Sequence, residues 1–179
     1  SACMATPVID CPNVRHSIAQ RLLQERPAEV SGSLGMCLLQ GVTSNAKLET
    51  LRMLLDAGAN VGAVFGDDVQ PVTHGTTALH HAVYHCVESH KKDADPPYGG
   101  EKRTDAEAVV RLLIERGAPL DVQSRADLSP KPWRTIVAGS TPRDIALACE
   151  NADVAVAVAA IIDHAVAKRD AARAALLGA

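Results

Sequence analysis

The stretch that decides the fold is LRMLLDAGA, at residues 51–59. The same chemistry returns as VRLLIERGA at residues 110–118, with the apolar residues, the arginine, the acid and the Gly-Ala pair in the same order. A weaker third copy, RLLQER at residues 21–26, is followed by Pro27 in place of the glycine. In each copy the apolar residues recur at helical spacing, so they form one stripe along a helix. The pattern therefore predicts a helix that is repeated along the chain.

Glycines mark where these helices end. Gly58 and Gly117 follow the last apolar residues of their stretches, at the left-handed position that closes many helices and that glycine adopts at least cost. A second element also recurs: GTTALHHA at 75–82 matches GSTPRDIA at 139–146, and GSLGMCLL at 32–39 is a degenerate version. In the copy at 139–146, Thr141 suits a helix N-cap and Pro142 suits a first helical turn. Each repeated unit is therefore expected to hold two helices.

Together these elements resemble the ankyrin repeat family. The family signature is a Thr-Pro-Leu-His-x-Ala helix start, a second helix ending in Leu-Leu, and a Gly-Ala turn leading into a β-hairpin. TALHHA at residues 77–82 departs from this signature only by Ala78 in place of proline, and LLDAGANV at 54–61 is close to the signature. The resemblance covers roughly residues 14–162. It implies an all-α solenoid of paired antiparallel helices with extended β-hairpin finger loops. About three repeats would stand between an N-terminal half-repeat and a C-terminal capping helix.

The units are irregularly spaced. Gly58 and Gly117 lie much farther apart than the family period of about 33 residues. The excess falls in three polar insertions, which we expect to form surface loops; they lie at residues 62–74, 87–103 and 119–139. The expected boundaries are a flexible N-terminal segment (1–12) and a single domain (13–179), divided into a half-repeat (13–31), three repeats (32–74, 75–138, 139–164) and a C-terminal helix (165–178).

The tail after Ala152 carries two conflicting signals. Val154, Val156 and Val158 alternate with alanine, which by itself is typical of a strand. The repeat phase and the high helix propensity of alanine favour a helix instead. We expect a helix, because a lone exposed strand would have nothing to pair with.

The composition excludes several functional classes. A net charge of −3 and only 2% aromatic residues leave neither a basic footprint nor a stacking platform, so no nucleic acid is expected as a partner. The longest apolar run, at residues 154–162, is too short to span a bilayer, and the first residues do not resemble a signal peptide. Five dispersed cysteines are typical of reduced thiols. We therefore expect an intracellular protein, cytoplasmic or nuclear, with no membrane contact.

One cluster suggests metal chemistry. His81 and His85 lie four residues apart, as do Cys86 and His90, and such pairs can ligate zinc from one helix face. A zinc site would need further ligands from elsewhere, and the resemblance implies that His80 is instead a structural hydrogen-bonding residue between neighbouring repeats. Adjacent residues such as His85 and Cys86 point about 100° apart on a helix, which is poor geometry for a nucleophile and its base. No catalytic residue, metal or cofactor is therefore expected, and the chain is not expected to be an enzyme.

The resemblance implies instead that a protein partner binds a concave face lined by first helices and hairpin tips. Aromatic residues and arginine are enriched in binding hot spots, and the few aromatics here fall in insertions or at variable positions. An alternative interpretation is that Trp133 only fills a gap in its own loop. Another is a regulatory or structural subunit whose inserted loops bind a small ligand or metal, and the chain could be part of a longer one. The candidate protein-binding residues are Phe65, Asp67, Asp68, His81, Tyr84, His85, Trp133, Arg134 and Cys149.

Overall fold

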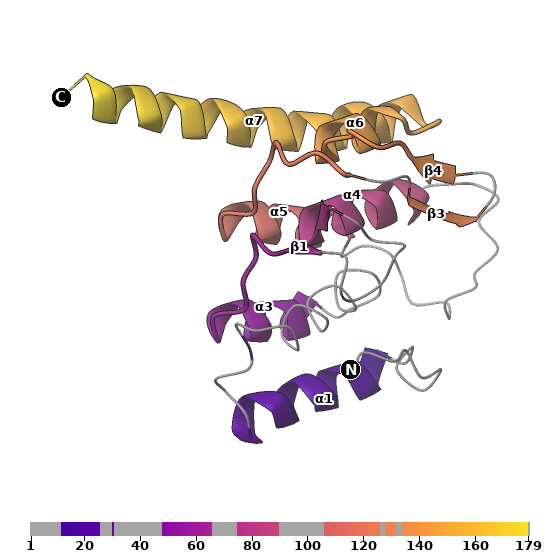
Figure 1. Ribbon diagram of the computed structural model, residues 1–179, viewed down its shortest axis with the longest axis vertical. Coiled ribbons are helices and arrows are strands. Elements are labelled where there is room, and N and C mark those ends of the chain that lie inside the picture. Colours follow the sequence, from indigo (N-terminus) through magenta and orange to yellow (C-terminus); the bar gives the residue numbers. More distant parts are fainter. Residues whose placement is uncertain are drawn as a thin grey trace.

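The computed structural model describes residues 12–25, 30, 48–65, 75–89, 106–125, 128–131 and 134–178. Over this part the chain is mostly helical, as the sequence predicts. Figure 1 shows the helices stacked in tiers along the long axis of the molecule, with α1 at one end and α6 and α7 at the other. The helices are α1 (Pro12–Glu25), α3 (Leu48–Asp56), α4 (Ala78–Ser89), α5 (Ala106–Glu115), α6 (Pro142–Leu147) and α7 (Ala152–Leu177). The degenerate copy at residues 32–39 and most of the predicted N-terminal segment lie outside the described residues.

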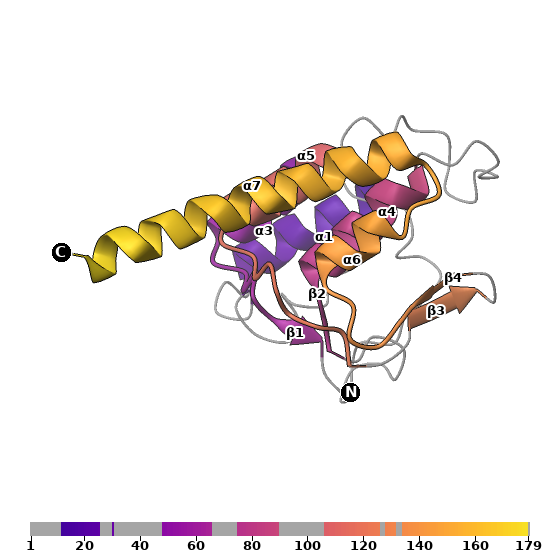
Figure 2. The same ribbon diagram turned by 90° about the horizontal axis from the view of Figure 1, so that it is seen from above.

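The helices form two columns. In one column α1 packs on α3, α3 on α5, and α5 on α7; in the other α4 packs on α6. Across the columns α4 packs against α5, and α6 packs against α7 as a helical hairpin with a short turn at residues 148–151 (Figure 2). Polar contacts join successive tiers: the His16 imidazole meets the Thr50 hydroxyl at 2.7 Å, and Arg116 pairs with Asp56 at 2.6 Å.

The two clean copies of the repeat close their helices with the same hydrogen bonds. At the end of α3 the amide of Ala59 donates to the carbonyl of Leu54, and that of Gly58 donates to Leu55. At the end of α5, Ala118 and Gly117 make the equivalent two bonds, and both glycines have positive φ, +90° and +84°. This is the Schellman arrangement, which satisfies carbonyls that the last helical turn leaves without partners. The predicted helix ends are thus confirmed.

A short antiparallel hairpin follows each of these turns. Strand β1 (Val64–Phe65) pairs with β2 (Thr76–Thr77), and β3 (Leu128–Lys131) pairs with β4 (Arg134–Ile136). Their registers place Phe65 opposite Thr76, and Lys131 opposite Arg134. The second hairpin and strand β1 lie in predicted insertions, whereas β2 lies in the stretch at 75–82 whose pattern predicts a helix start. Each hairpin delivers the chain to the first turn of α4 or α6.

The core runs through all tiers and is built from aliphatic side chains. The predicted stripe of α3 is confirmed, since Leu51, Leu54 and Leu55 are buried and Leu48 is half-buried. In the equivalent stripe of α5, Val110 and Leu113 are buried and Ile114 is half-buried, whereas Glu107 is exposed. The largest fully buried side chains include Leu51, Leu54, Leu79, Leu113, Ile162 and His80. The one polar side chain in this list, His80, requires hydrogen-bond partners inside the core.

The C-terminal region differs from the expected division. The tail is helical, as predicted, but the predicted boundary between residues 164 and 165 does not exist: α7 is one helix of 26 residues that begins after an Asn151 cap and ends at Gly178. No glycine or proline interrupts residues 152–177, so the helix has no local reason to stop where the packed part ends. Among the described helices, none is both long and apolar enough to cross a membrane.

Candidate functional site

His80 joins two neighbouring units. Its side chain is fully buried, and Nδ1 accepts a hydrogen bond from the amide of Thr77 at 3.1 Å while lying 2.9 Å from the hydroxyl of the same residue. Because Nδ1 is an acceptor, Nε2 carries the proton and donates to the carbonyl of Ser140, 60 residues ahead, at 3.3 Å. The imidazole thus links the start of α4 to the backbone just before α6. These contacts agree with the structural role expected for this histidine.

Three of the candidate binding residues lie together on α4. His81, Tyr84 and His85 are each half-buried, whereas their neighbours Ala82 and Val83 are buried. The Nε2 atom of His81 lies 3.1 Å from the hydroxyl of Thr76. The rings of Tyr84 and His85 meet edge to face, with centroids 5.5 Å apart. Side chains three and four positions apart share a helix face, so α4 presents imidazole and phenol groups along its partly exposed side.

Burial keeps the imidazoles of His80 and His81 neutral. It lowers the pKa of His81 to about 3, and the neighbouring imidazoles of His85 and His80 lower it further through charge repulsion. Burial also lowers the pKa of His80, against the opposing effect of its backbone hydrogen bonds. At neutral pH, His80 and His81 are therefore uncharged hydrogen-bonding groups.

The protein is expected to lose stability in mild acid. The folded-state pKa of His81 lies below the ordinary value of 6.5, so the unfolded chain takes up a proton that the folded chain refuses. Above pH 6.5 the imidazole is neutral in both states, so the shifted pKa does not affect the free energy of unfolding. As the pH falls from 6.5 towards 3, the free energy of unfolding decreases by up to about 1.4 kcal/mol per pH unit for each such histidine. Urea denaturation between pH 7 and 4.5 measures the slope. His81→Gln should flatten it, and an unchanged slope in that variant would refute the assignment to His81.

The two described cysteines lie where α4 and α6 approach each other. Cys86 is buried, Cys149 is partly buried, and neither forms a disulfide. Burial raises the pKa of Cys86 to about 11, and the nearby Glu107 and Cys149 raise it further. A nucleophilic cysteine needs the opposite shift, because the thiolate is the reactive form. The Cys86 thiol is therefore a packing group in this structure.

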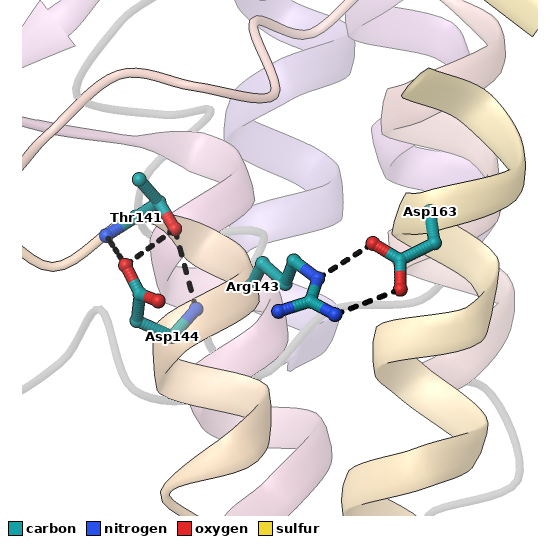
Figure 3. A network of polar contacts seen from close by, with 4 residues as sticks. All are labelled: Thr141, Arg143, Asp144 and Asp163. Atoms are coloured by element: carbon teal, nitrogen blue, oxygen red, sulfur yellow. Dashed lines mark hydrogen bonds and ion pairs between the residues drawn. The ribbon is translucent and has the colours of Figure 1, made fainter. Parts of the chain in front are cut away.

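The start of α6 is fixed by a local network (Figure 3). The hydroxyl of Thr141 accepts from the amide of Asp144, and the carboxylate of Asp144 accepts from the amide of Thr141, which makes a capping box with Pro142 in the first turn. Arg143 reaches across to α7 and binds Asp163 through two contacts, at 2.6 and 3.0 Å. The predicted N-cap at Thr141 is thus confirmed, and the ion pair holds α6 against α7.

The structure places the remaining candidate residues only in part. Cys149 follows α6, which packs beside α4, and lies near Cys86 of that helix. Phe65 ends β1 and Arg134 begins β4, but only their backbones are described. Asp67, Asp68 and Trp133 lie outside the described residues, so their predicted roles stay predictions.

Sequence reasoning missed one contributor to this site. Thr76 is fully buried and holds the imidazole of His81. Its position between Gly75 and Thr77, just before α4, was the available signal, because threonine side chains near helix starts commonly bond to nearby groups. As for metals, the described histidine, cysteine and acidic side chains form no group of three or more that could hold an ion, and His90 of the suggested pair lies outside the described residues.

Comparisons with protein-family models, with curated proteins and with solved structures find no significant match to this chain. Its function must therefore be argued from its own residues.

Proposed function

We propose that this chain is an ankyrin-repeat protein with long loop insertions, which binds a partner protein and does not catalyse a reaction. The proposal is supported by the unit that occurs twice: a helix, a Schellman turn on glycine, a short hairpin, and a second helix start. It is also supported by His80, which ties one unit to the next through Ser140. A stack of such units presents its first helices side by side, as α4 and α6 are here.

The proposed binding site rests on one observation, that α4 has a partly exposed face. The edge-to-face pair of Tyr84 and His85 lies there beside His81, and Cys149 comes from the neighbouring unit. The finger residues Phe65, Asp67, Asp68, Trp133 and Arg134 would border this face. Because His81 stays neutral, the central part of the surface recognises a partner through an aromatic ring, apolar contact and imidazole hydrogen bonds. Such a surface suits a partner segment with an apolar or aromatic anchor.

Tyr84→Ala is expected to weaken binding of the partner by about thirtyfold, which corresponds to the loss of about 2 kcal/mol that marks a hot-spot residue. The partner is first isolated by using the purified chain as bait, followed by mass spectrometry. The affinities of the wild type and the variant for that partner are then compared by calorimetry.

Stability provides the control, because Tyr84 also packs against the core. Tyr84→Phe keeps the ring, so it should retain both stability and most of the affinity. If Tyr84→Ala lowers the melting temperature but leaves the affinity of the folded protein for the partner unchanged, Tyr84 is only a packing residue. The proposal that the partner binds the α4 face is then wrong. If the bait retains no discrete protein, the proposed function itself fails.

A further inference from the structure

Ser124 holds the base of the second hairpin with every polar group that it has. Its amide donates to the carbonyl of Ser140 at 3.0 Å, and its carbonyl accepts from the amide of Gly139 at 2.7 Å. Its hydroxyl donates to the carbonyl of Val137 at 3.0 Å. Ser124 is buried, so these bonds form where little water competes for them. One residue thus binds the whole turn at residues 137–140, which the amide of Ser140 closes by donating to Val137.

The first hairpin has a different residue at this position. Phe65 stands seven residues after Gly58 and pairs with Thr76. Ser124 stands at the same distance after Gly117. The backbone pairing therefore belongs to both repeated units, but a phenylalanine has no hydroxyl with which to make the third bond. The side-chain bond of Ser124 is thus an addition in the second hairpin.

This addition acts on the segment that we call the second finger, residues 125–136. The second finger includes β3 and β4 and lies between Ser124 and Val137. Figure 2 shows its two strands projecting to one side of the helices. Holding the two ends of a loop together reduces the number of conformations that the loop can adopt. Because the base is the point about which the second finger would swing, a further bond there restrains the direction of the whole finger.

The same base is anchored to the start of α4. The Ser140 carbonyl that accepts from Ser124 also accepts from Nε2 of His80, in the first turn of α4. In addition, the backbone of Arg125 passes so close to Gly75 that a Cβ on Gly75 would lie 2.7 Å from the Arg125 nitrogen. Two separate contacts therefore fix the base of the second finger relative to α4, whose partly exposed face is the proposed binding site.

We propose that Ser124 is a positioning residue, which holds the second finger and the face of α4 as one preorganised surface for the partner. The inference rests on the proposed function, because it concerns the same partner. A partner that contacts both parts would otherwise have to order the second finger as it binds, and that ordering weakens the affinity. Ser124 acts from the base of the finger and need not touch the partner.

A matched pair of substitutions tests this role. Ser124→Thr keeps the hydroxyl, whereas Ser124→Val has nearly the same shape without it, so the cost of the added volume is common to both. Hydrogen exchange of the amides in the second finger reports how often the finger opens. This exchange should be about fivefold to tenfold faster in the valine variant than in the threonine variant, which is the effect of one lost hydrogen bond. Ser124→Ala against the wild type repeats the comparison without added volume.

The affinity for the partner is the second measurement, made by calorimetry at a temperature at which all variants are fully folded. The valine variant should bind at least about threefold more weakly than the threonine variant. A residue with only a structural role would change the melting temperature but not this affinity. Equal exchange of the second finger within both pairs, or equal affinities, would overturn the inference. If the bait retains no partner, the proposed function fails, and the exchange comparison, which needs no partner, shows separately whether Ser124 restrains the finger.

Discussion

His80→Ala is expected to lower the free energy of unfolding by about 3–5 kcal/mol. The substitution leaves the amide of Thr77 and the carbonyl of Ser140 without the partner that each has in the fully buried imidazole. Each buried polar group that loses its partner costs about 1–3 kcal/mol, and the vacated volume adds the cost of a cavity. Chemical denaturation monitored by circular dichroism measures the loss.

A glutamine at this position provides the comparison. His80→Gln keeps one acceptor and one donor on a side chain of similar reach, so it should recover part of the stability that alanine loses. If alanine and glutamine are equally destabilising, the hydrogen bonds are not the cause. A loss below about 1 kcal/mol for alanine would mean that His80 does not join the two units, since that is only the net worth of one ordinary hydrogen bond.

Gly75→Ala is expected to destabilise the fold by about 2–5 kcal/mol, for two separate reasons. Gly75 has a φ of +75°, which costs a residue with a Cβ about 1–2 kcal/mol. In addition, a Cβ at this position would lie 2.7 Å from the backbone nitrogen of Arg125, in the segment that leads into the next hairpin. Backbone atoms cannot yield as a flexible side chain can, so the overpacking adds about 1–3 kcal/mol.

Gly139 separates these two reasons. It occupies the equivalent place before α6 and has a similar φ of +88°, but a Cβ there would meet nothing within 4 Å. Gly139→Ala should therefore show only the backbone cost, about 1–2 kcal/mol. Equal losses at the two positions would argue that the close approach of Arg125 to Gly75 contributes nothing. The comparison uses the same denaturation measurement for both variants.

Much of the candidate site was within reach of the sequence, for reasons that lie within a few residues. The helical spacing from His81 to His85 places Tyr84 and its neighbours along α4, and the pattern around Thr141 predicts the start of α6. The contact between His81 and Thr76 was missed although the two residues are only five positions apart. The approach of Cys149 to Cys86 could not be predicted, because it depends on how α6 packs beside α4. The suggested metal pairs illustrate the same limit, since ligand spacing on one helix says nothing about ligands from another.

What the sequence by itself determined are the features that arise within one or two helical turns. The Schellman ends at Gly58 and Gly117 and the cap at Thr141 depend on hydrogen bonds between residues at most five positions apart. The apolar stripe of α3 depends on the helical spacing of its leucines. The packing of distant segments was decided only by the tertiary structure. It selects Ser140 as the partner of His80, brings Arg125 against Gly75, and lowers the pKa of His81 by removing water. It also decides where the core beneath α7 ends, because the local propensity of that helix is the same on both sides of the point where packing stops.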